Sequence, residues 1–337
     1  MSACKKAVFY ANDTLDNIRN MEYYSEEIRA ITDAGYEVIV CNKYREIPYN
    51  FDLILIYWWT YSLPILLFCL FFRRKAFVSG AFNFKFQEWQ SGNDYFRRPI
   101  WQKILLNLSL LLSNKNLFIS KNDFLQCKSY FKLSNAHFHP PCVSTDYFEN
   151  HANSSREKKA LTMSWLSQGN LHRKGIFDSI NAIRLLKDDG FEARLHIIGM
   201  IGDAYDELLH HIKKLGLEEN IKVEVNVPRD RKIELMRSYN LYIQPSYYEG
   251  FGLSAAEALA SGMNVIASRV GDVFNTLGEN AYYVEPGNIK EIADAYKELI
   301  GCVKSPEAIR VSREYLLDNF SYENKKNFYK NCLLNKE

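Results

Sequence analysis

Short apolar runs alternate with longer stretches of mixed polarity along the first half of the chain. The runs occupy residues 7–12, 36–42, 53–57, 75–80 and 116–120. They are too short for most helices and rich in Val, Ile and Leu, so they predict buried parallel strands. A helical pattern over 18–33, stopped by Gly35, joins the first two. This alternation predicts a doubly wound α/β sheet.

The second half repeats the same pattern. Apolar runs at 158–166, 193–199, 221–227, 241–246, 264–268 and 281–286 predict strands. Helical patterns separate them at 175–187, 204–215, 230–239 and 289–301. The chain therefore predicts a second doubly wound domain. Two such domains facing each other predict a ligand site in the cleft between them.

A polar stretch with two prolines, HPPCVSTDYFENHANSSREKK, marks the expected join between the domains. We expect an N-terminal domain over 1–155 and a second domain over 156–305. Ser305-Pro306 then sets off a helical tail over 306–337.

Two apolar segments of the first domain raise the question of membrane contact. Residues 51–72 are long enough to span a bilayer, but Asp52 and Pro64 interrupt them, which favours a strand, a loop and a short helix from Leu63. Residues 101–112 predict a second apolar helix. Basic residues flank both segments, which suits a peripheral seat on an anionic membrane surface. The alternative is two core-packed helices with solvated basic ends.

Composition and charge exclude several classes of protein. The 337 residues are 47% hydrophobic and 24% charged, with a net charge of +2, which implies no nucleic-acid partner. Seven scattered cysteines without a C-x-x-C pair indicate reduced thiols in a cytoplasmic protein. The N-terminus lacks a long apolar signal region. No G-x-G-x-x-G follows an early strand, which argues against a dinucleotide-dependent oxidoreductase.

The stretch YYEGFGLSAAEALASG carries two carboxylates, Glu249 and Glu257, around a flexible turn. It follows a predicted strand, and ligands of parallel sheets bind beyond the carboxyl ends of strands. Glycines allow close approach to the backbone, and a helix opening near Ser254 suits a phosphate. Carboxylates repel phosphate, so we expect them to accept hydrogen bonds from sugar or ribose hydroxyls. Alternatively, Ser254 and Glu257 form a capping box, and Glu249 is a surface residue.

Lys174 occupies the corresponding loop of an earlier strand, within the sequence HRKG. An ammonium at a helix entrance can stabilise a departing diphosphate without a metal, although a solvated loop lysine is the alternative. His137 and His139 have spacing that can bind a metal, but no Asp or Cys partners surround them, and no D-x-D triplet occurs. We therefore expect no metal site and no cofactor.

Residues 245–288 resemble the retaining glycosyltransferases of family 4, which have the GT-B fold. The resemblance lies in a strand ending in PS, the run EGFGLSAAEALASG, the strand NVIAS and the closing PGN. A weaker match extends back to Leu161. The tail NFSYE resembles the helix with which family members return to the N-terminal domain, so the resemblance implies that role for 306–337.

The resemblance also implies roles for individual residues. It implies catalytic roles for Glu249, near the donor sugar, and for Lys174, on the diphosphate. Glu257 would accept from the ribose hydroxyls. The remaining donor-binding residues are Gly250, Phe251, Gly252, Leu253, Ser254 and Arg173, the last standing in for an arginine that the family carries where this chain has Trp165.

The implied function is metal-independent transfer of a sugar, with retained configuration, from a UDP- or GDP-linked donor. The expected acceptor is a glycan or lipid-linked saccharide in polysaccharide or glycoconjugate biosynthesis. The expected location is the cytoplasm, with peripheral contact at the inner face of the membrane. The family's glycine loop after the first strand and its histidine after the fourth are absent, as is the arginine. A non-catalytic nucleotide-sugar-binding partner subunit is therefore the alternative.

Overall fold

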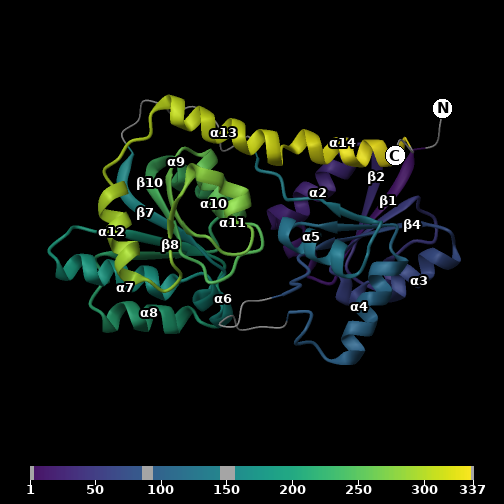
Figure 1. The fold of residues 1–337 in the computed structure, drawn as a ribbon, viewed down its shortest axis with the longest axis horizontal. Coiled ribbons are helices and arrows are strands. Elements are labelled where there is room, and N and C mark those ends of the chain that lie inside the picture. Colours follow the sequence, from purple (N-terminus) through teal and green to yellow (C-terminus); the bar gives the residue numbers. More distant parts are fainter. Residues whose placement is uncertain (1–3, 86–93, 145–155, 335–337) are drawn as a thin grey trace. The chain divides into compact units, whose positions relative to one another are not determined.

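The computed structural model describes residues 4–85, 94–144 and 156–334 (Figure 1). The chain divides into two compact units. Unit 1 comprises Met1–Cys142 together with Phe320–Glu337, and unit 2 comprises Val143–Asn319. The domain boundary expected at residue 155 lies outside the described residues.

Unit 1 is built on a six-stranded parallel sheet with the order β2-β1-β3-β4-β5-β6. Its strands are β1 (Lys5–Ala11), β2 (Tyr36–Cys41), β3 (Leu53–Tyr57), β4 (Lys75–Gly80), β5 (Lys115–Phe118) and β6 (Ala136–Phe138). All five residues of β3 are buried, as expected for a central strand covered on both faces.

Helices cover both faces of this sheet. They are α1 (Leu15–Asn20), α2 (Glu22–Asp33), α3 (Leu63–Phe71), α4 (Ile100–Leu112), α5 (Lys121–Tyr130) and α14 (Tyr322–Leu333). Alternate strand residues such as Val8 and Ile54 share a core with α3, α4 and α5. Their neighbours Phe9 and Leu55 share the opposite core with α1, α2 and α14. The period of two along each strand thus divides the helices between the faces.

Unit 2 contains a second six-stranded parallel sheet, with the order β12-β11-β10-β7-β8-β9. Its strands are β7 (Glu157–Met163), β8 (Leu195–Gly199), β9 (Ile221–Val225), β10 (Tyr239–Gln244), β11 (Asn264–Ser268) and β12 (Tyr282–Val284). Its helices are α6 (Gln168–Arg173), α7 (Ile176–Asp188), α8 (Tyr205–Lys214), α9 (Arg229–Ser238), α10 (Leu253–Ala260), α11 (Val273–Leu277), α12 (Ile289–Leu299) and most of α13 (Pro306–Phe320).

The faces of this sheet also carry different helices. Leu241 and Ile243 of β10 contribute to a core shared with α6, α7, α8 and α12. Tyr242 lies between them and faces the other side, where its hydroxyl meets Ser254 of α10. A polar side chain from a buried central strand is thereby carried toward the entrance of α10.

These two sheets confirm the α/β, doubly wound fold that the apolar pattern predicts. Residues 51–72 form β3 and α3, as the interruptions at Asp52 and Pro64 predict. Among the helices that the structure describes, none is long and apolar enough to cross a membrane. The expected helix over 18–33 is divided by Met21, which caps both α1 and α2. The ligand cleft between the two domains stays a prediction.

Candidate functional site

The candidate site lies at one edge of the sheet of unit 2, where two neighbouring parallel strands end. Strands β7 and β10 pair directly, so the loops that follow them leave the sheet side by side. The first leads through α6 to Lys174, and the second carries Glu249 to the start of α10. A backbone hydrogen bond of 2.8 Å from the Tyr247 amide to the Arg173 carbonyl joins the two loops. Residues 75 positions apart along the chain thus become neighbours.

Glu249 and Lys174 form an ion pair at this junction. The Lys174 Nζ lies 3.3 Å from Glu249 Oε2, and each side chain is only 14% exposed. Arg173 Nη1 lies 3.4 Å from the same oxygen. The two residues for which the family resemblance implies catalytic roles, and the neighbouring Arg173, therefore come together in the structure.

The surroundings set the charge of both groups. Burial raises the pKa of Glu249, but Lys174 and then Arg173 stabilise the carboxylate, and its net pKa lies below the ordinary value. Burial lowers the pKa of Lys174, which the nearby Glu249 offsets only in part. The carboxylate is consequently ionised at neutral pH, and the desolvated Lys174 amine lies beside it.

Two polar side chains of β10, which the sequence alone does not single out, orient Glu249 through consecutive hydrogen bonds. The Tyr242 hydroxyl donates to Gln244 Oε1 at 2.9 Å, and Gln244 Nε2 donates to Glu249 Oε2 at 3.2 Å. Both are almost fully buried. Their signal in the sequence is a tyrosine and a glutamine inside an otherwise apolar strand, just before the EGFG turn.

A glycine from a different loop also fixes the backbone of Glu249. Gly271 has φ +54°, and a side chain at this position would collide with the Glu249 carbonyl. The next amide, of Asp272, donates to that same carbonyl at 3.3 Å. The loop after β11 thus supports the Glu249 loop, and only glycine allows so close an approach.

Helix α10 begins earlier than expected, and this corrects one interpretation of Glu257. Its N-cap is Gly252, at φ 86°, and no side chain caps the helix. Ser254 therefore lies inside the first turn, and the alternative interpretation of Ser254 and Glu257 as a capping box is wrong. The amides of Leu253 and Ser254 precede the first intrahelical hydrogen bonds, which Ala255 and Ala256 donate to the Gly252 carbonyl. These early amides and the helix dipole favour an anion.

Glu257 lies on the buried side of α10 and pairs with a lysine that the sequence analysis misses. Its residue exposure is 3%, and Lys232 Nζ lies 3.3 Å from each of its carboxylate oxygens. The charges of both Glu257 and Glu249 also act on Lys174. Lys232 stands in the first turn of α9, after β9. Its position, a lysine at a helix start after a strand, is the signal that singled out Lys174.

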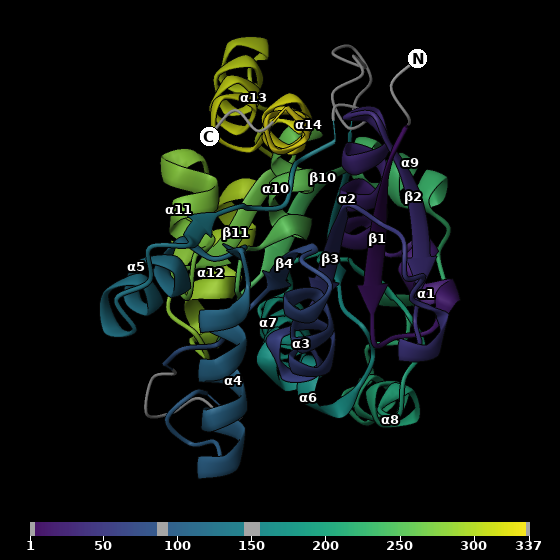
Figure 2. The same ribbon diagram turned by 90° about the vertical axis from the view of Figure 1, so that its right-hand side faces the viewer.

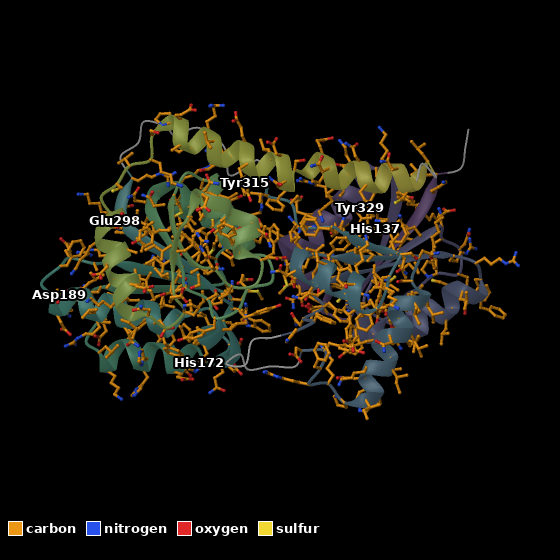
Figure 3. The ribbon with its side chains drawn as sticks, in the orientation of Figure 1. His137, His172, Asp189, Glu298, Tyr315 and Tyr329 are labelled. Atoms are coloured by element: carbon orange, nitrogen blue, oxygen red, sulfur yellow. The ribbon has the colours of Figure 1, made fainter. Side chains whose placement is uncertain are left out.

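Arg173 and Trp165 occupy different surroundings. Arg173 donates from Nη1 to the Tyr248 carbonyl at 2.8 Å and from Nη2 to Asn170 at 2.9 Å. It lies on α6 beside His172, which Figure 3 labels. Trp165 is 51% exposed, and its indole N–H donates to the Ile201 carbonyl. Arg173 forms a hydrogen bond with Glu249, whereas the hydrogen bond of the Trp165 side chain goes to Ile201.

The other predicted donor-binding residues follow Glu249 directly. Gly250 forms part of the turn, and Phe251 is buried at 5% exposure just before the Gly252 cap. Within residues 4–85, 94–144 and 156–334, no group of three or more His, Cys, Asp or Glu side chains could hold a metal. His139 instead lies in unit 1, 3.3 Å from Glu27.

Comparison with known proteins identifies a family that matches the part of the chain containing the site. Residues 146–311 match the family described as glycosyl transferases group 1. The 2-deoxystreptamine glucosyltransferase of Streptomyces kanamyceticus is 27% identical over 152 residues, covering 44% of this chain and 39% of that protein. The capsular polysaccharide biosynthesis glycosyltransferase CapM of Staphylococcus aureus is 28% identical over 129 residues, covering 38% of this chain and 33% of that protein.

Solved structures match the fold over nearly the whole chain. Sucrose-phosphate synthase from Thermosynechococcus elongatus superposes with a TM-score of 0.75 at 15% identity, over 98% of this chain and 100% of that one. Anabaena HepE, in complex with UDP and glucose, gives a TM-score of 0.75 at 14% identity, with the same coverage. With its two parallel sheets the chain has the GT-B fold, and its residues 146–311 belong to the glycosyl transferases group 1 family.

Proposed function

We propose that this protein is a retaining, metal-independent glycosyltransferase of family 4 that uses a nucleoside-diphosphate sugar. The observation that carries the proposal is the buried Lys174–Glu249 pair at the entrance of α10. A cation beside the N-terminus of a helix suits a diphosphate, and a carboxylate next to it suits sugar hydroxyls. Because HepE is described with UDP and glucose, UDP-linked donors come first among candidates.

When the donor binds, Lys174 and Glu249 would contact the donor instead of each other. The diphosphate would accept hydrogen bonds from the Lys174 ammonium and from the amides of Leu253 and Ser254. Glu249, held by Gln244, would accept from hydroxyls of the sugar. Glu257 would accept from the ribose, with Lys232 keeping the carboxylate oriented. Arg173 supplies further positive charge at 3.4 Å from Glu249.

The reaction breaks the bond between the anomeric carbon and the diphosphate oxygen, which keeps the electron pair. Lys174 and the α10 amides stabilise the negative charge that develops on that oxygen. The acceptor hydroxyl forms the new bond on the same face of the sugar, and its proton passes to the departing phosphate. Anomeric configuration is thereby retained, and no side chain serves as a nucleophile.

The acceptor is proposed to be a glycan or a lipid-linked saccharide in polysaccharide or glycoconjugate biosynthesis, bound by unit 1. CapM, one of the relatives, is described as a capsular polysaccharide biosynthesis enzyme. None of the seven cysteines forms a disulfide, which suits a reducing cytoplasmic location.

Release of nucleoside diphosphate from UDP- and GDP-sugars, with and without acceptors, tests the proposal. We expect Glu249→Gln to lower turnover about 100-fold while changing UDP affinity less than about three-fold, since its contacts matter most in the transition state. Glu298→Gln, at an exposed position of α12 labelled in Figure 3, is the matched control and should leave turnover unchanged. The anomer released by slow donor hydrolysis, observed by NMR, reports the stereochemistry.

A non-catalytic nucleotide-sugar-binding subunit is the second candidate. The observation in its favour is the exposed Trp165 where the resembled family carries a diphosphate-binding arginine. The wild-type protein is to be tested with every donor and a broad panel of acceptors. Binding of nucleotide without release of nucleoside diphosphate from any donor would support this candidate and contradict the proposed glycosyltransferase activity.

A further inference from the structure

Helix α4 exposes an apolar stripe instead of a polar one. Its exposed residues Ile100, Trp101, Ile104, Leu108 and Leu111 recur at helical spacing and lie within one side of the helix. Ile100 is 76% exposed, Leu111 68% and Trp101 60%. The opposite side, with Leu106 and Leu110, packs into the core of unit 1. A surface helix normally has one apolar side, which packs on the core, and one polar side, which faces water. Because α4 is apolar on both sides, its outer side suits contact with something other than water.

Helix α3 repeats this arrangement. Ile65, Leu66 and Cys69 are buried against the sheet. On the outer side, Phe71 is 81% exposed and Leu70 62%. Leu67, at 52% exposed, lies one turn before Phe71 on the same side.

The two exposed stripes face the same direction. Helices α3 and α4 pack against each other, and both contribute to the core on the same face of the sheet. Figure 2 shows them neighbouring each other in front of that sheet. Their outer sides therefore form one apolar surface, which we call the α3–α4 face: Leu67, Leu70, Phe71, Ile100, Trp101, Ile104, Leu108 and Leu111.

Positive charge surrounds the α3–α4 face. Neither α3 nor α4 contains an Asp or Glu. Arg73, Arg74 and Lys75 follow α3 directly. Arg97 and Arg98 precede α4, and Lys103 lies in its first turn. The nearby Asp94 is 3% exposed and lies 4.0 Å from Arg97, so it offsets the charge of that one arginine.

We propose that the α3–α4 face seats this protein on an anionic lipid bilayer. Exposed aromatic and aliphatic side chains enter the boundary between headgroups and acyl chains, while the basic residues contact acidic headgroups. The helices have nine and 13 residues, so they lie in the plane of the surface. Membrane binding through the α3–α4 face does not involve the donor site. It would keep the protein at the membrane, where a lipid-linked acceptor is found.

Charge also distinguishes lipid from a second copy of this chain. In a two-fold dimer the same face meets itself, so the cations of one copy would approach those of the other. Repulsion between like charges opposes that pairing, whereas acidic headgroups neutralise the same cations. An anionic bilayer is therefore the occupant that suits both the apolar and the charged residues.

Co-sedimentation of the full chain with lipid vesicles tests the proposal. We expect binding to vesicles of phosphatidylcholine and phosphatidylglycerol in equal parts, much weaker binding to phosphatidylcholine alone, and weakening by salt. Trp101→Ser and Phe71→Ser should each lower partitioning about ten-fold, because each removes a large apolar side chain from the lipid boundary. Arg73→Gln should lower it about five-fold.

Val303→Ser is the matched control, since Val303 is 79% exposed but belongs to unit 2. It should bind vesicles like the wild type. Equal binding by wild type, Trp101→Ser and Phe71→Ser would overturn the proposal. So would a lipid-free dimer, seen by light scattering, that Trp101→Ser converts to monomer without any change in vesicle binding. UDP titration of the same variants should match wild type, which separates failure of this proposal from failure of the donor site.

Discussion

At the scale of single residues, the structure changes the interpretation of Glu257 most. A capping role is excluded because Gly252 caps α10 and Ser254 lies within the first turn. A buried carboxylate then needs another reason to be stable, and Lys232 provides it at 3.3 Å from both oxygens. Burying such a pair costs desolvation energy, so stability alone does not account for it, and the pair agrees with the proposed ligand role of Glu257.

This view makes a prediction about the ribose. We expect wild-type protein to bind UDP about ten-fold more tightly than 2′-deoxy-UDP, because a hydrogen bond to a charged acceptor is worth more than a neutral one. In Glu257→Gln this preference should fall to about two-fold. Isothermal titration calorimetry of both nucleotides against both proteins measures it.

Lys232→Met separates positioning from direct contact in this experiment. It keeps the Glu257 carboxylate but removes its partner, so the preference for ribose should shrink while some UDP binding persists. An unchanged preference in Glu257→Gln would mean that Glu257 does not contact the ribose.

At the scale of elements, a buried polar cluster fixes helix α14 to the rest of unit 1. Lys325 and Tyr329 of α14 both contact the Glu27 carboxylate of α2, and His139 lies 3.3 Å from it. All four residues are at most 5% exposed. Tyr329, labelled in Figure 3 near His137 of β6, donates to Glu27 at 2.6 Å. Burial raises the pKa of Glu27, but Lys325 and His139 outweigh it, and the carboxylate stays charged.

Removing one member should therefore cost much more than removing a surface pair. We expect Lys325→Met to lower the free energy of unfolding by about 3 kcal/mol, because it leaves Glu27 buried without its main counter-charge. Lys326→Met, which breaks a pair with the exposed Glu323, should cost less than about 0.5 kcal/mol. Urea denaturation gives both values, and hydrogen exchange should show α14 opening first in Lys325→Met. Equal losses for the two variants would contradict this account of α14.

The same elements show which parts of the structure the sequence reveals. Strands such as β3 are predictable because five consecutive buried residues leave a continuous apolar run. Strand β6 is missed because its three residues, only one of them buried, carry too short a pattern. The break between α1 and α2 is missed because Met21 is neither Gly nor Pro. Local patterns therefore reveal long central elements better than short ones.

The candidate site follows the same logic. Lys174 and Glu249 stand at strand ends before helices, so general rules locate them. The contribution of Lys232 depends on Glu257, which is 25 residues away, and no local pattern connects them. Glu27 and Lys325 are 298 residues apart and meet only once the sheet is built.

At the scale of the whole molecule, the polypeptide contains two units, each built on its own parallel sheet. Unit 2 places a cation, two carboxylates and a helix entrance at the carboxyl edge of its sheet, which is where open parallel sheets bind ligands. Unit 1 presents the α3–α4 face on one side of its sheet and holds α14 on the other. The proposed nucleotide-sugar site therefore lies within unit 2.

Titration of UDP against wild type and Lys174→Met tests the central claim most directly. We predict that Lys174→Met weakens UDP binding at least about ten-fold, because a charge-assisted contact to the diphosphate is lost. Lys213→Met, at an exposed position on α8, should bind like the wild type. Equal UDP affinity in all three proteins, or no binding of any nucleoside diphosphate by the wild type, would contradict a donor site at Lys174 and Glu249.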